Sequence, residues 1–224
     1  MALVRELRPG LWHWQAPHPW WKEGTPWARD VSSYALDDGE RLVLFDPLAV
    51  PGELLELAAE REPVIALTAP WHERDARDLI ARLAAPIYAP PADTVEDMIG
   101  KYHVPAEQAE AWGGSPDLDW LRAGGGDAHW TVAGDRLPGG IEAFAGYEHN
   151  DLVLWVESRN ALVAGDLLSG LLDETAVHSK WLRRGVSREE LATGLRRLLE
   201  LPVELVLPAH GAPTDRAALE RALA

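Results

Sequence analysis

Two halves of the sequence follow a similar order of short β segments and helices, and this order limits the possible folds more than any other feature. In the first half, residues 31–36 and 41–45 read as strands joined by Asp37-Asp38-Gly39, a turn typical of a β-hairpin. The other predicted strands are 64–67, 86–89, 130–132, 141–144, 152–156, 161–164 and 203–207. The predicted helices are 51–61, 75–83, 187–200 and 214–223, and one more opens at 93–96.

Strands and helices in this order do not form a regular strand–helix–strand series. They predict two mixed β-sheets packed together with helices outside, a four-layer αββα sandwich of the α/β (α+β) class. Residues 101–128 have no clear pattern and are interpreted as an inserted or mobile segment. No low-complexity tract or linker divides the chain, so residues 1–224 are expected to form one domain.

Charge and cysteine content exclude several classes of protein. The net charge of -15 argues against a broad basic surface for nucleic acid or anionic membranes. With no cysteine, any metal must bind to His, Asp or Glu. No apolar run reaches the roughly 18 residues of a membrane span, and the N-terminus does not resemble a signal peptide. We therefore expect a cytoplasmic protein with a small-molecule ligand or substrate, and the sequence leaves its oligomeric state open.

Residues 67–75, L-T-A-P-W-H-E-R-D, form the turn between a predicted strand and a predicted helix. In α/β enzymes such turns often carry the chemistry. The crowded His72, Glu73, Arg74 and Asp75 are consistent with a metal site, with the remnant of one, or with a polar helix start.

Tryptophan is frequent near the N-terminus, where five of the eleven indoles fall within residues 12–27. These rings either pack against the edge of the core or form an aromatic wall over a pocket.

Three passages resemble the metallo-β-lactamase superfamily. V-S-S-Y-A-L-D-D-G-E-R-L-V-L-F-D-P is similar to the family's opening hairpin, which ends in an aspartate near the active site, here Asp46. G-Y-E-H-N-D-L-V-L-W-V-E-S-R-N-A-L-V-A-G-D resembles its second metal segment, which ends at Asp166. L-P-A-H-G resembles the segment of its last histidine, here His210. The resemblance implies the sandwich fold and a site for up to two metal ions, usually zinc.

The family's motif H-x-H-x-D-H is degenerate in this chain. Counted from Thr68, its histidine positions hold Ala69, Trp71 and Arg74, and its aspartate position holds Glu73. A shift of one residue instead places His72 on the second histidine, and the sequence does not decide between these registers.

The second segment also departs from the family pattern. Tyr147 replaces its histidine, with His149 nearby, so that only Asp166 and His210 match. The predicted cleft residues are Trp71, Glu73, Arg74, Tyr147, His149 and Asp46. Because an arginine repels a metal ion, Arg74 is predicted to replace one as the counter-charge of Asp166.

The resemblance implies a hydrolase of small esters or thioesters with a degenerate centre. At most one zinc or iron ion would be held by Asp166 and His210, with help from His72 or Glu73. The alternative is a metal-free binding or regulatory protein that uses the same cleft. A third possibility is metal-independent acid–base catalysis by His72 with Asp75 or Asp166.

Overall fold

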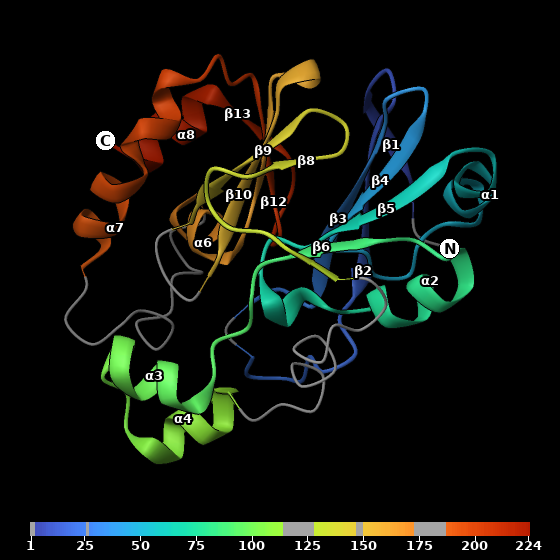
Figure 1. The fold of residues 1–224 in the computed structure, drawn as a ribbon. Coiled ribbons are helices and arrows are strands. Elements are labelled where there is room, and N and C mark those ends of the chain that lie inside the picture. Colours follow the sequence, from blue (N-terminus) through green and yellow to red (C-terminus); the bar gives the residue numbers. More distant parts are fainter. Residues whose placement is uncertain (1–2, 26, 114–127, 147–149, 173–186) are drawn as a thin grey trace.

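Two β-sheets form the centre of the molecule in the computed structural model, which describes residues 3–25, 27–113, 128–146, 150–172 and 187–224. The first sheet has seven strands in sequence order (Figure 1). They are β1 (Arg5–Arg8), β2 (Leu11–Pro17), β3 (Asp30–Asp37), β4 (Arg41–Phe45), β5 (Glu62–Ala66), β6 (Ile87–Ala89) and β7 (Ala128–Trp130). Strands β1 to β4 are antiparallel, and β4 to β7 run parallel.

The second sheet has six strands in the order β13-β12-β11-β10-β9-β8. They are β8 (Arg136–Leu137), β9 (Ile141–Ala145), β10 (Leu152–Val156), β11 (Ala161–Ala164), β12 (Leu205–Pro208) and β13 (Thr214–Asp215). Among the described strands of this second sheet, only β11 and β12 pair in parallel. Both sheets therefore contain parallel and antiparallel pairs, as predicted.

Helices cover the outer face of each sheet. The described α-helices are α1 (Gly52–Glu60), α2 (Ala76–Leu83), α3 (Val95–Tyr102), α4 (Ala106–Gly113), α6 (Asp166–Leu172), α7 (Arg188–Leu195) and α8 (Arg216–Ala222). The 3-10 turns are η1 (Pro70–His72), η2 (Glu157–Arg159) and η3 (Arg196–Glu200). Helices α1 and α2 lie on the first sheet, and α6, α7 and α8 on the second (Figure 1).

Three apolar clusters correspond to the three interfaces of a four-layer sandwich. Between the sheets, Tyr34 and Phe45 of the first pack with Ile141 and Leu154 of the second. On the outer faces, alternate residues of the same strands contact the helices, for example Leu44 in β4 and Trp155 in β10. This period of two buries both faces of each sheet and confirms the predicted αββα architecture.

The region between β6 and β7 differs from the sequence prediction. Its capping box consists of Thr94 and Asp97, whereas the sequence suggested a box over residues 93–96. Helix α3 extends to Tyr102 and helix α4 follows, so part of the segment expected to be irregular is helical. The α4 sequence, with several alanines but a weak apolar stripe, gave little periodic signal.

No helix within the described residues is both long enough and apolar enough to cross a membrane.

Candidate metal centre

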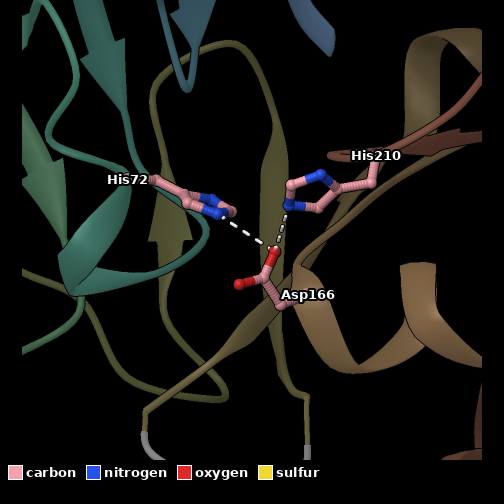
Figure 2. A group of neighbouring side chains, drawn as sticks. All are labelled: His72, Asp166 and His210. Atoms are coloured by element: carbon pink, nitrogen blue, oxygen red, sulfur yellow. Dashed lines mark hydrogen bonds and ion pairs between the residues drawn. The ribbon is translucent and has the colours of Figure 1, made fainter. Parts of the chain in front are cut away.

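Three loops from both sheets bring His72, Asp166 and His210 together (Figure 2). His72 ends η1, which follows β5, whereas Asp166 and His210 follow β11 and β12. The Nε2 atoms of His72 and His210 lie 3.1 and 3.2 Å from the same oxygen, Oδ1 of Asp166. One ligand atom from each residue lies within 4.8 Å of the others. The cluster therefore offers two imidazole nitrogens and one carboxylate oxygen to a single point.

Asp46 and Thr68 hold the other side of the His72 ring. His72 Nδ1 is 3.0 Å from Asp46 Oδ2 and 3.0 Å from the Thr68 hydroxyl. Asp46 in turn accepts hydrogen bonds from the backbone N–H and hydroxyl of Thr68, at 2.8 and 2.5 Å. The side chains of His72 and Asp46 are only 5% and 3% exposed. Asp46 therefore orients His72 from beneath the centre, which agrees with its predicted place near the site.

The charges in this cluster are tightly coupled. Burial alone would lower the pKa of His72, but the carboxylates of Asp166 and Asp46 raise it to about 9. Burial alone would raise the pKa of each aspartate, but the neighbouring imidazoles hold both below their usual range, and that of Asp166 well below it. Without a metal, a protonated His72 between two carboxylates is thus the favoured state. The counter-charge of Asp166 is His72.

Arg74 does not form an ion pair with Asp166, contrary to the predicted counter-charge, although burial lowers the pKa of Arg74 and the carboxylates of Asp46 and Asp166 oppose that lowering. Its Nη1 donates to the carbonyl oxygens of Ser32 and Asp46, at 2.8 and 2.7 Å, and to the Ser33 hydroxyl at 3.3 Å. Arg74 adopts a left-handed φ of 44°, which belongs to the tight turn between η1 and α2. Its guanidinium joins the ends of β3 and β4, so Arg74 supports the floor of the site instead of the cluster itself.

Asp75 has a role other than the one expected, and Glu73 lies outside the cluster of His72, Asp166 and His210. Asp75 Oδ2 accepts a hydrogen bond from the backbone N–H of Ala49 at 2.6 Å, so Asp75 anchors the loop after β4. It does not bond to His72, whose ring nitrogens face Asp46 and Asp166. Glu73 lies in the turn before α2, and it is not a member of the three-residue cluster. Of the two aspartates offered as partners of His72 for acid–base catalysis, the structure therefore brings Asp166 to the ring and not Asp75.

Trp71, one of the predicted cleft residues, reaches the site. Its indole N–H donates to Oδ2 of Asp166 at 2.7 Å. Tyr147 and His149, the other predicted cleft residues of the second segment, lie outside the described residues.

Asp151 is a residue that sequence reasoning missed. Its buried carboxylate accepts a hydrogen bond from the backbone N–H of Asp166 at 2.8 Å, at the first residue of α6. A Cβ added at Gly146 or Gly165 would lie 2.2 or 2.0 Å from an oxygen of this carboxylate. Both glycines are therefore explained by the space that Asp151 needs. The sequence did offer a signal for this role. Asp151 stands directly before the apolar strand β10, and Gly146 and Gly165 lie in the loops on either side of the hairpin that β10 forms with β11.

Replacing Asp151 with alanine is expected to destabilise the protein by about 2 kcal/mol, because the N–H of Asp166 would lose a buried, charged acceptor. Urea unfolding followed by circular dichroism measures this change. Asp78→Ala, at an exposed position of α2, serves as the control and should shift stability by less than about 0.5 kcal/mol. Equal effects of the two substitutions would contradict the assigned role of Asp151.

Two serines hold the loop that carries His210. Ser169 in α6 donates to the Gly165 carbonyl at 2.6 Å and accepts from the Ala209 N–H at 2.9 Å. On the opposite side, Ser32 in β3 donates its backbone N–H to the Ala209 carbonyl and its hydroxyl to the Gly211 carbonyl, at 2.9 and 2.6 Å. Ala209 is thereby fixed to α6 and β3, and Gly211 to β3.

The N-terminal aromatic residues divide between core and site. Trp14 is fully buried and donates to the Leu48 carbonyl at 2.8 Å, so it belongs to the core. The ring of Trp27 lies 5.2 Å from that of His210, and His18 packs edge-on against Trp27 at 5.0 Å. Burial and the positive charges of the site lower the pKa of His18 to about 4. The core interpretation is therefore correct for Trp14, and Trp27 lies beside His210 in the candidate site.

Comparison with known proteins identifies the fold. No protein-family model matches this chain, and no curated protein matches it. Solved structures do match. TMB-1, studied for the role of two residues in substrate and inhibitor binding, has a TM-score of 0.63 and 14% identity, over 99% of this chain and 95% of its own. DIM-1 metallo-β-lactamase, exposed to ceftazidime, has a TM-score of 0.63 and 14% identity, over 99% and 94% of the two chains. A metallo-β-lactamase from Hirschia baltica has a TM-score of 0.58 and 13% identity, over 99% and 96%. At these identities the likeness is one of fold.

Proposed function

We propose that this chain, which has the metallo-β-lactamase fold, is a hydrolase-like protein with a degenerate centre that holds a single metal ion. The observation that carries the proposal is the convergence of His72, Asp166 and His210 within 4.8 Å. Zinc enzymes commonly use three protein ligands of this kind and keep a fourth position open. Two histidines and one carboxylate also suit iron.

The surroundings of His72 fit a metal ligand. The bond between its Nδ1 and Asp46 leaves Nε2 to face Asp166 and the centre. Carboxylate–histidine pairs of this kind fix the ring and increase the basicity of metal-binding imidazoles. These contacts support His72, instead of Glu73, as the third ligand of the proposed centre.

A bound zinc ion would supply Lewis-acid chemistry and lower the pKa of a coordinated water to about 7. The chain itself would orient the reacting group. Trp71 is 37% exposed beside Asp166, and Trp27 packs against His210. These indoles favour a substrate with an apolar portion, such as a small ester or thioester, over a strongly hydrated anion.

A second candidate is a metal-free binding or regulatory protein. It is supported by the contacts that already satisfy the Asp166 carboxylate, since both of its oxygens have donors from the protein. A carboxylate that is paired in this way does not need a cation to compensate for its burial.

Metal stoichiometry distinguishes these candidates. We expect one zinc ion per chain to survive dialysis, measured by native mass spectrometry with zinc, iron and manganese offered in turn. Asp166→Asn should weaken zinc binding by about 100-fold or more, because it removes the central anionic ligand. Asp78→Asn, on the exposed face of α2, should leave binding unchanged.

Two tightly bound ions would contradict the one-metal centre, and none would favour the metal-free candidate. Hydrolysis of a panel of thioesters and aryl esters by zinc-loaded protein then tests the activity. It should be lost in Asp166→Asn and retained in Asp78→Asn.

A further inference from the structure

Trp71 contacts the Asp166 carboxylate on the oxygen that the histidines leave open. The two imidazoles meet Oδ1, at 3.1 and 3.2 Å, whereas the indole N–H meets Oδ2 at 2.7 Å. Trp71 and His72 are adjacent in η1, so one short turn delivers donors to both oxygens. Both oxygens of the Asp166 carboxylate therefore have donors.

An indole N–H differs from an imidazole in one decisive respect. It is a donor only and has no lone pair for a cation. A histidine at this position could share a metal with Asp166, but the tryptophan occupies the same oxygen with a neutral hydrogen-bond donor. Its ring covers the approach to Oδ2, which a second metal ion would need.

We propose that Trp71 is a positioning and selectivity residue, which turns Oδ1 toward the two histidines and closes Oδ2 to a second metal. This inference rests on the proposed function, because it explains why the centre would hold a single ion. It assigns to Trp71 two separable properties. The N–H group orients Asp166, and the absence of a metal-binding atom sets the stoichiometry.

Two substitutions separate these properties. Trp71→Phe keeps an aromatic ring but removes the donor, so the protein should still bind one zinc ion, with affinity reduced about 10- to 100-fold. Trp71→His supplies a ligand beside Oδ2 and should allow a second zinc equivalent in native mass spectrometry. Trp130→Phe, which alters a 42% exposed indole on β7, is the matched control and should match the wild type.

A metal-independent measurement tests the hydrogen bond itself. In ¹⁵N-labelled, metal-free protein, the indole resonance that Trp71→Phe removes should shift on Asp166→Asn, whereas the resonance of Trp130 should not. An unmoved Trp71 resonance, or undiminished zinc affinity of Trp71→Phe, would overturn the positioning role. One equivalent in Trp71→His would overturn the selectivity role. If no variant binds zinc, the proposed function and the selectivity role both fail, and the resonance alone decides whether Trp71 positions Asp166.

Discussion

Replacing Arg74 with methionine is expected to lower the free energy of unfolding by about 3 kcal/mol, which is large for one side chain. Methionine keeps much of the aliphatic length but removes the donors to the Ser32 and Asp46 carbonyl oxygens. These carbonyls lie at the ends of adjacent strands and would lose a charged donor in a poorly hydrated place. Urea unfolding of the metal-free protein measures the loss.

Arg82→Met is the matched control for this substitution. Arg82 is an exposed residue of α2, so its replacement should change stability by less than about 0.5 kcal/mol. If the two arginine variants unfold at the same urea concentration, Arg74 does not brace the strand ends. If Arg74→Met lowers zinc affinity without lowering stability, Arg74 acts on the metal centre and not on the strands.

The metal-free protein is expected to lose about 3 kcal/mol of stability between pH 6 and pH 10 through His72 alone. The pKa of His72 is raised from an ordinary value of 6.5 to about 9. Its contribution is therefore complete below about pH 6.5 and disappears as the pH rises through about 9. In His72→Gln this part of the pH dependence should be absent, and exposed His129→Gln should behave as the wild type.

Acid has the opposite effect through the aspartates. The pKa values of Asp46 and Asp166 are lowered in the folded state, so their contributions are complete above about pH 4 and are lost as the pH falls further. Together, His72, Asp46 and Asp166 make their largest combined contribution to stability between about pH 4 and pH 6.5. Equal alkaline destabilisation of wild type and His72→Gln would show that His72 is not the coupled group.

The sandwich could be predicted because its signals are local and repeated. Alternating apolar residues mark the strands, Asp37-Asp38-Gly39 marks a hairpin, and the Ser187–Glu190 capping box marks the start of α7. Asp166 and His210 were placed in the site by the segments around them, and the structure brings them together with His72. Asp166 and His210 could be found because the segments around them resemble those of the superfamily, and His72 because it lies in the loop between a predicted strand and a predicted helix.

The partners of the charged residues could not be predicted in the same way. Arg74 binds two backbone carbonyls, and Asp75 and Asp151 accept from backbone N–H groups. A backbone group has no residue type that would mark it in a sequence, whereas complementary charges suggest pairs that the fold does not bring together. The predicted pairing of Arg74 with Asp166 rested on complementary charge alone.

The meeting of His72 with His210 at one carboxylate also acts as a cross-link. His72 and Asp166 are 94 residues apart in the sequence, and they come from opposite sheets of the sandwich. The chain has no cysteine and therefore no disulfide. A metal at this point would restrict the unfolded chain much as a disulfide closing a loop of that length does, by about 4 to 5 kcal/mol in the chain-entropy model if the ion stayed bound on unfolding. Metal binding would then stabilise the folded state by linking the two halves of the chain, and removing the metal would reverse this effect. Such stabilisation does not depend on any catalytic activity.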